Sequence, residues 1–149
     1  MTAAPFAAAA NILRGLAVQV NMEAAAKYAW IAAGGAAGAV SRWAAGAALA
    51  GAGAAHGFPL ATLLVNLLGA YALGRLRGRW SSVRGKRAVF YQAVTGGFLG
   101  SFTTMSAFGL ETWTLLADGR IAAGAFYALV SAAAGPLLAR VGMRRGIPA

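Results

Sequence analysis

Four long stretches without charged side chains limit what this chain can fold into. They cover residues 28–50, 58–76, 88–116 and 121–139, with Arg42 near the end of the first, Arg75 at the end of the second and Glu111 near the end of the third. An α-helix needs about 20 residues to cross roughly 30 Å of hydrocarbon. Each stretch can therefore span a bilayer once. The pattern predicts an all-α membrane protein with four transmembrane helices.

The composition agrees with a membrane protein and excludes other classes. Of the 149 residues, 60% are hydrophobic and 11% are charged, whereas a soluble domain carries about 25% charged residues. The acids are Glu23, Glu111 and Asp118, there is one histidine, His56, and cysteine is absent. We expect no enzyme, because these residues cannot supply a catalytic triad, a thiol nucleophile or a Cys/His metal site. The net charge of +10 does not indicate nucleic-acid binding, which needs a basic face on a soluble domain.

The cations predict an orientation in the membrane. Arg42 and Arg120 are assigned to one side of the bilayer. The other side holds the N-terminus, the loop between the second and third spans, and the C-terminus. It carries 11 of the 13 cations, namely Arg14, Lys27, Arg75, Arg77, Arg79, Arg84, Lys86, Arg87, Arg140, Arg144 and Arg145. Because Lys and Arg accumulate in cytoplasmic loops, both termini are predicted to be cytoplasmic.

Polar side chains within the spans are candidate functional residues, since polar groups are costly in hydrocarbon. Thr62 and Asn66 share one face of the second span, and they serve either interhelical hydrogen bonding or substrate contact. In the third span, three glycines and four hydroxyls fall between residues 96 and 106. This composition favours a helix break, which is tolerated at membrane depth only inside protein or beside a cavity. Freed carbonyls there could coordinate a cation, and freed amides could favour an anion.

Three motifs in these spans resemble the Fluc (CrcB) family of fluoride channels. Residues 34–42 read GGAAGAVSR, and the family pattern is GGxxGAxxR. Residues 59–69 read PLATLLVNLLG, against PxGTLxxNxxG. Residues 97–111 read GFLGSFTTMSAFGLE, against GFxGGxTTFSTFxxE. The motifs follow the family's order and spacing, and the resemblance covers residues 28–142.

The resemblance implies a four-helix subunit with a broken third helix that forms an antiparallel dimer in the bacterial inner membrane. Two pores in the dimer would export fluoride passively from the cytoplasm and relieve its toxicity. A structural sodium ion at the dimer centre would be bound by the carbonyls of Gly100 and Thr103. The motifs place Arg42 at a vestibule. They assign the pore to Asn66, Thr62, Met105, Ser106 and Phe108, and the family's YxxxS pattern in the fourth helix adds Tyr127 and Ser131.

The expected pore chemistry suits a small, strongly hydrated anion. Neutral hydroxyl and amide donors can replace the water around fluoride without trapping it. The positively polarised edge of a phenyl ring can also face an anion. A fixed Lys or Arg inside the pore would bind the ion too tightly, and we expect none there.

The channel domain is predicted to cover residues 27–142, followed by a basic tail at 143–149. Residues 1–26 would be an N-terminal extension, for which two explanations stand. Either Met22 is the true start, or the segment is an amphipathic helix on the membrane surface. Family members have about the length of this chain counted from Met22, which favours the alternative start.

Two departures from the family pattern concern the pore and the partner. Met105 replaces the first pore phenylalanine and has no positively polarised ring edge, and Ala107 replaces a hydroxyl. One of the two pores lined by each subunit would then conduct poorly. An antiparallel homodimer also requires the same chain to insert into the membrane in both orientations. The predicted distribution of 11 cations on one side and two on the other disfavours this. The second subunit is either another copy or an oppositely oriented paralogue, and the cations favour the paralogue.

A small multidrug-resistance type exporter is the main alternative, since it also has four short helices and is often antiparallel. Proton-coupled export of cations needs a buried carboxylate in the first span, and Glu23 precedes that span. A purely structural subunit would not need the break in the third span. The sequence therefore favours fluoride conduction.

Overall fold

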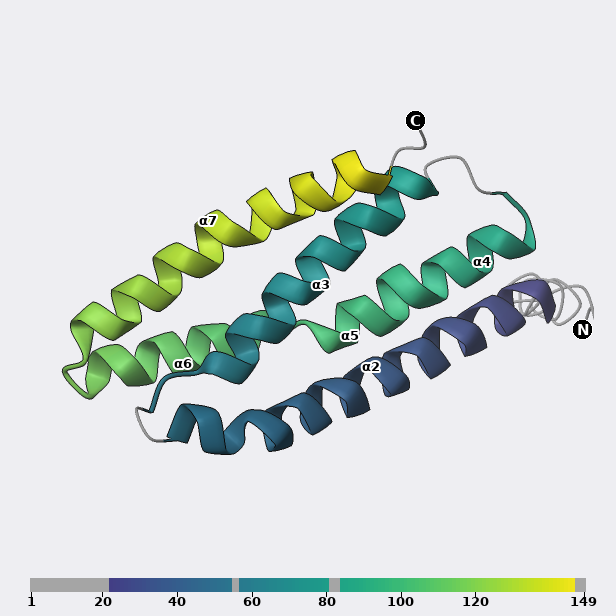
Figure 1. The fold of residues 1–149 in the computed structure, drawn as a ribbon. Helices are drawn as coiled ribbons and strands as arrows, with labels where there is room; N and C mark the ends of the chain where they lie inside the picture. The colour runs from purple at the N-terminus through teal and green to yellow at the C-terminus, as the bar shows by residue number, and fades with distance from the viewer. Residues whose placement is uncertain (1–21, 55–56, 81–83, 147–149) are drawn as a thin grey trace, which may run out of the picture.

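The computed structural model describes residues 22–54, 57–80 and 84–146. Every regular element in these residues is a helix (Figure 1). The interpretations of residues 1–21 fall outside the described part of the chain. The elements are α2 (Met22–Ala54), α3 (Leu60–Arg79), α4 (Lys86–Gln92), the π-helical η1 (Ala93–Leu99), α5 (Gly100–Phe102), α6 (Met105–Ala117) and α7 (Ile121–Gly146).

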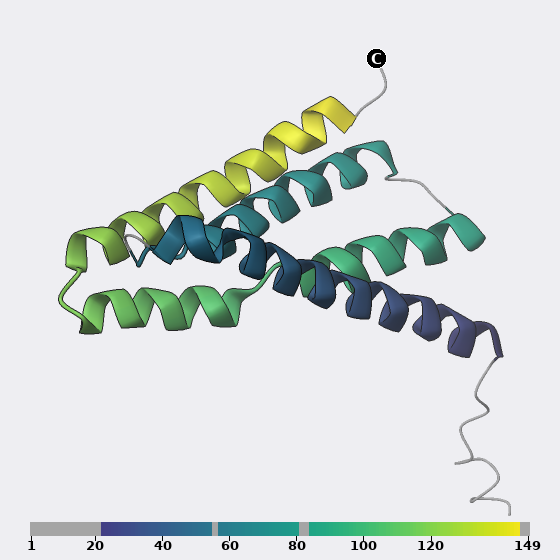
Figure 2. The ribbon, with the colours of Figure 1, turned by 60° about the horizontal axis from the view of Figure 1, so that its bottom comes forward.

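The helices form four passes along a common direction, with α4, η1, α5 and α6 together making the third (Figure 2). α3 packs along α7, and α2 packs along η1 and α5. The prediction of an all-α fold is confirmed. The helices extend beyond all four predicted spans, because α2 continues to Ala54, α3 to Arg79, α6 to Ala117 and α7 to Gly146.

Glycines explain how closely the passes approach each other. A Cβ atom at Gly34 would collide with the carbonyl oxygen of Ala93, and one at Gly38 with that of Phe98. Between α3 and α7, a Cβ atom at Gly74 would meet the carbonyl oxygen of Ala139. Membrane helices associate through such close backbone contact, because hydrocarbon provides no hydrophobic driving force between them.

The third pass leaves helical geometry at two threonines. Thr103 has φ −83° and ψ 160°, and Thr104 has φ −150° and ψ 124°. The glycines of the same segment remain helical, since Gly96 and Gly97 lie in η1 and Gly100 begins α5. The interruption between α5 and α6 therefore falls at β-branched residues, which tolerate extended backbone well.

Few side chains are buried within the single chain. Leu63, Leu115 and Tyr127 form the centre of an apolar cluster, whereas Trp43 is 74% exposed and Leu129 70% exposed. Among the described helices, only residues 121–144 are long and apolar enough to cross a membrane by length and composition. The third pass falls short of that length because it is divided into short helices. α3 is less apolar because it ends in several arginines.

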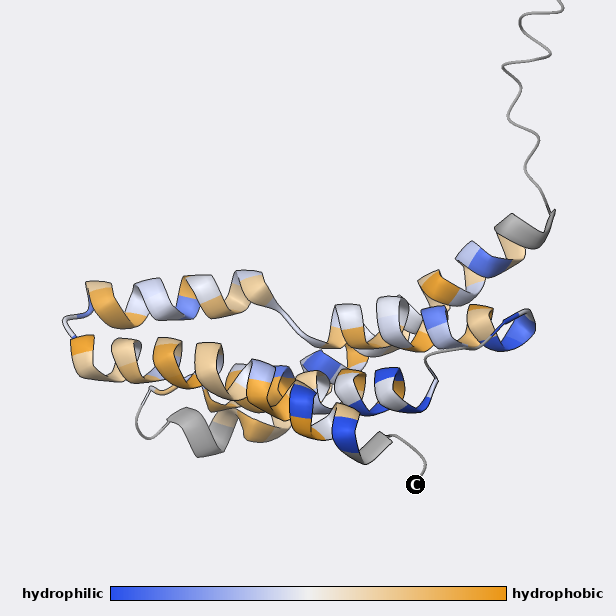
Figure 3. Cartoon of the chain, turned by 90° about the horizontal axis from the view of Figure 1, so that it is seen from above, coloured by the Kyte–Doolittle hydropathy of each residue, from blue (hydrophilic) through white to orange (hydrophobic). Residues whose placement is uncertain are grey.

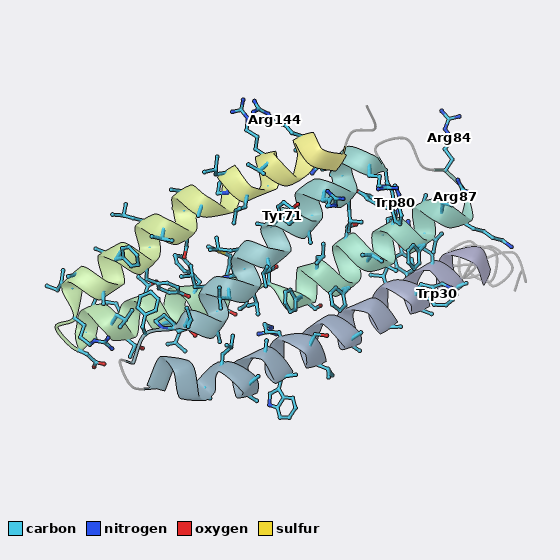
Figure 4. The ribbon with its side chains drawn as sticks, in the orientation of Figure 1. Trp30, Tyr71, Trp80, Arg84, Arg87 and Arg144 are labelled. Atoms are coloured by element: carbon cyan, nitrogen blue, oxygen red, sulfur yellow. The ribbon has the colours of Figure 1, made fainter. Side chains whose placement is uncertain are left out.

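Hydrophilic residues gather at one end of the molecule (Figure 3). The start of α2, the end of α3, the start of α4 and the end of α7 meet there (Figure 1). Arg84, Arg87 and Arg144 lie at this end, together with Trp30 and Trp80 (Figure 4). We call it the cationic end.

Candidate ion pathway

Asn66 on α3 closes the break in the third pass. Its Nδ2 donates to the carbonyl oxygen of Thr104 at 2.9 Å, and its Oδ1 accepts from the Thr104 amide at 2.8 Å. The side-chain amide thus imitates a backbone partner and satisfies both polar groups of a residue in extended conformation. An unpaired backbone group would be costly at this depth. In this single chain, Asn66 therefore acts first as a support for the break.

The break redirects two amides away from their helical acceptors. In a continuous helix the Thr104 amide would bond the carbonyl of Gly100, and the Ala107 amide that of Thr103. Instead the Thr104 amide donates to Asn66, and the Ala107 amide donates to the Thr104 hydroxyl oxygen at 3.2 Å. The carbonyls of Gly100 and Thr103 thereby lose their helical donors.

Arg42 on α2 satisfies another carbonyl at the end of α5. Its Nε donates to the carbonyl oxygen of Ser101 at 3.0 Å. Because α2 continues to Ala54, the Arg42 guanidinium lies level with the break and not at the end of the helix. Arg42 also lines a pocket of about 330 Å³ between α2, α3 and α6.

A cavity of about 420 Å³ lies beside the break and brings together four of the predicted pore residues, namely Asn66, Met105, Phe108 and Ser131. Gly100 and Thr103 line it as well. The hydroxyl oxygen of Ser131 is buried and has no hydrogen-bond partner among the described residues. The lining of this cavity contains no charged side chain.

Thr62 and Tyr127 belong to a different cluster, which is centred on Glu111 of α6. The Thr62 hydroxyl donates to Glu111 Oε1 at 2.7 Å, and the Tyr127 hydroxyl donates to Glu111 Oε2 at 2.8 Å. Tyr127 is completely buried. One carboxylate thus joins α3, α6 and α7.

The ring of Phe108 separates the cavity from the Glu111 cluster. Its centroid lies 5.1 Å from that of Tyr127, and Tyr127 in turn meets Phe58 edge-on at 5.7 Å. Met105 is 77% exposed. Ser106 is also exposed, and its hydroxyl lies 3.2 Å from that of Thr104. Six of the seven predicted pore residues therefore fall into a cavity group and a carboxylate group, with the Phe108 ring between them, and Ser106 belongs to neither.

Sequence reasoning missed the role of Glu111, which it treated only as part of a motif. A signal was available, because a carboxylate in an apolar span needs hydrogen-bond donors. Two predicted hydroxyls, Thr62 and Tyr127, were suitable donors. The sequence alone could not show that they converge on it.

Comparison with known proteins identifies the relatives of this chain. The family model described as CrcB-like protein, Camphor Resistance (CrcB), matches residues 29–143. A protein of Thermus thermophilus named fluoride-specific ion channel FluC is 40% identical over 121 residues, which cover 80% of this chain and 93% of the relative. A protein of that name from Methylobacterium nodulans is 43% identical over 91 residues, which cover 60% of this chain and 73% of the relative.

A Staphylococcus aureus protein named fluoride-specific ion channel FluC 1 is 33% identical over 120 residues, which cover 80% of this chain and 96% of the relative. The residues that the family model matches include the break, Asn66 and Glu111. The chain therefore belongs to the CrcB family of membrane proteins.

Proposed function

We propose that this chain is a subunit of a channel that lets fluoride leave the bacterial cytoplasm passively across the inner membrane and so relieves fluoride toxicity. The observation that carries the proposal is the cavity at the break, where Asn66, Ser131 and Phe108 meet without a charged side chain. The names of the relatives agree with this chemistry. As a channel, the protein would have no enzymatic activity.

The lining of the cavity suits transfer of a hydrated anion. The buried hydroxyl of Ser131 can donate to an ion that has lost part of its water. A cation fixed in the lining would hold the ion, whereas neutral donors and a ring edge release it. Met105 is an exposed residue of the lining, and there it offers a polarisable sulfur in place of a ring edge.

The break also fits a sodium ion. Hard cations prefer oxygen ligands, and the carbonyls of Gly100 and Thr103 have lost their helical donors. We propose that these two carbonyls hold a structural sodium ion together with the same carbonyls of the second subunit. The ion would neutralise exposed carbonyl dipoles where two breaks meet. Replacing sodium in all buffers by N-methyl-D-glucamine should then abolish fluoride flux, and restoring sodium should recover it.

We further propose that the second subunit lies antiparallel to this one and is an oppositely oriented paralogue. The cations gathered at one end support a single orientation, with both termini in the cytoplasm. The exposure of Met105, at 77%, supports a pore wall that another subunit completes. Fluoride flux from this chain alone, with half of the purified subunits inverted, would overturn the paralogue and leave a homodimer.

The test of channel function is fluoride efflux from liposomes, measured with a fluoride electrode after the membrane potential is released by valinomycin. We expect flux from the full chain reconstituted with its second subunit. Asn66→Asp should abolish flux, because the substitution removes the donor to the Thr104 carbonyl and brings a negative charge to the pathway.

Phe108→Ile tests the ring at the partition. An aromatic pair is worth about 0.5–1.5 kcal/mol, and loss of a ring-edge contact of similar strength should reduce flux up to about tenfold. Phe126→Ile is the matched control, since Phe126 is 58% exposed and lies outside the cavity lining. Equal flux from the two variants would contradict a pore role for Phe108.

The exporter alternative predicts a different result. Such a protein would move a cationic dye against its gradient when a proton gradient is applied, with no need for fluoride. Dye transport without fluoride flux would replace the channel proposal by the exporter.

A further inference from the structure

A groove near the cationic end lies outside the proposed pathway. It has a volume of about 520 Å³ and is lined by Leu73, Arg77, Trp80, Tyr91, Thr95 and Gly96. We call it the α3–α4 groove. Two of its residues, Leu73 and Thr95, also reach the cavity at the break, whereas Arg77, Trp80 and Tyr91 do not. These three residues therefore have no role in the proposed ion pathway.

The groove exists because α3 and the third pass diverge. They meet at the break, where a Cβ atom at Gly69 would collide with the Thr103 side chain. Toward the cationic end α3 packs against η1 but makes no helix-to-helix contact with α4. The ring of Trp80 bridges the gap, with its centroid 6.0 Å from that of Phe90 and 6.1 Å from that of Tyr91.

The lining changes from apolar to cationic along the groove. Leu73, Arg77 and Trp80 follow one another at helical spacing on one face of α3, which extends over roughly 10 Å of helix. Opposite them, a Cβ atom at Gly96 would find no atom within 4 Å, so the wall there is open. Trp80 and Tyr91 are the residue types that sit at the level of lipid headgroups.

We propose that the α3–α4 groove binds an anionic phospholipid of the cytoplasmic leaflet. The Arg77 guanidinium pairs with the phosphodiester. Trp80 and Tyr91 flank the glycerol region, and an acyl chain lies over Leu73 and Gly96. Basic grooves between transmembrane helices on the cytoplasmic side are suited to such headgroups. The proposal rests on the membrane placement and the orientation of the chain, and it does not require fluoride conduction.

The test is native mass spectrometry of the full chain in mixed micelles that contain equal amounts of phosphatidylglycerol and phosphatidylcholine. We expect the protein to retain phosphatidylglycerol in preference to phosphatidylcholine. Arg77→Gln should lower this preference about fivefold, which is the effect of one arginine near an anionic surface. Arg79→Gln is the matched control, because Arg79 is exposed on the same helix and does not line the groove.

A second pair of variants tests the acyl site without changing charge. Gly96→Leu should fill the open wall and reduce retention of both lipids, and the helical backbone of η1 accepts a side chain there. Gly109→Leu is its control, because a Cβ atom at Gly109 also meets nothing within 4 Å and the residue lies on α6. Thermal stability of each variant in detergent shows whether it is folded.

Three results would overturn the proposal. Equal retention of the two lipids by the unmodified protein would remove the headgroup specificity. Equal losses for Arg77→Gln and Arg79→Gln would reduce the effect to general surface charge. Competition by glycerol phosphate at the same concentration as the lipid would show a site for small anions. Because fluoride efflux is measured separately, failure of this proposal and failure of the channel proposal are distinguishable.

Discussion

At the scale of single residues, Glu111 accepts hydrogen bonds from two other helices. Its two oxygens take the hydroxyls of Thr62 and Tyr127 at 2.7 and 2.8 Å. A buried tyrosine hydroxyl needs an acceptor, and Tyr127 is fully buried. The carboxylate therefore holds α3 and α7 against α6 by hydrogen bonds.

A double-mutant cycle should detect this coupling. Glu111→Leu leaves the Tyr127 hydroxyl unsatisfied, which should cost about 1–3 kcal/mol of unfolding free energy. Tyr127→Phe should cost much less in the Glu111→Leu background than in the unmodified protein, because the unsatisfied hydroxyl is gone. Unfolding by denaturant titration in mild detergent measures both steps.

Thr114→Val provides the matched pair for that cycle. Thr114 lies on the same helix, but its hydroxyl donates to the carbonyl of Leu110 within α6. The losses of unfolding free energy from Thr114→Val and from Tyr127→Phe should therefore be additive within about 0.5 kcal/mol. A coupling as large for Thr114 as for Glu111 would show that the hydrogen bond to Tyr127 is not the cause.

The residue types at the site were predictable, and their partners were not. The motifs selected Asn66, Thr62 and Tyr127 as polar groups in apolar spans. Sequence spacing gives the face of a helix, but contacts between helices depend on which faces meet. The pairing of Asn66 with Thr104 joins residues 38 positions apart, so no local pattern contains it.

At the scale of elements, α6 begins because Thr104 caps it. The Thr104 hydroxyl accepts from the Ala107 amide, as an N-cap does. The glycines and hydroxyls between residues 96 and 106 predicted an interruption somewhere in that segment. Composition could not place it at Thr103 and Thr104, because Gly97 serves close packing and Gly96 leaves an open wall instead.

The close contact between α2 and η1 predicts that two glycine substitutions in α2 have unequal effects on stability. Gly38→Ala places a methyl group against the Phe98 carbonyl, and overpacking of this kind costs about 1–3 kcal/mol. Gly46→Ala on the same helix meets no atom within 4 Å, so it should be neutral or stabilise the helix by up to about 1 kcal/mol. The melting temperatures in detergent provide the comparison.

The result also bears on the pairing of α2 with the third pass. Equal melting temperatures for Gly38→Ala and Gly46→Ala would mean that α2 does not approach η1 as closely as the structure has it. A loss confined to Gly38→Ala supports the close contact.

At the scale of the whole molecule, the cationic end and the apolar exterior define how the protein sits in a membrane. The described residues at that end include Arg84, Arg87 and Arg144 (Figure 4). This end and the turn between α6 and α7 lie at opposite ends of the passes (Figure 1), so in the proposed channel they would face opposite sides of the bilayer. The imbalance of charge then favours a single orientation.

Cysteine accessibility in intact cells can test that orientation, because the chain has no cysteine of its own. Asp118→Cys marks the turn after α6, and Arg84→Cys marks the cationic end while leaving most of the cations in place. A membrane-impermeant thiol reagent should label Asp118→Cys from outside. It should label Arg84→Cys only after the cells are permeabilised, and the unmodified chain should stay unlabelled. Labelling of both variants from outside would mean that the chain inserts both ways up. It could then form the antiparallel dimer with its own copies, and no paralogue would be required.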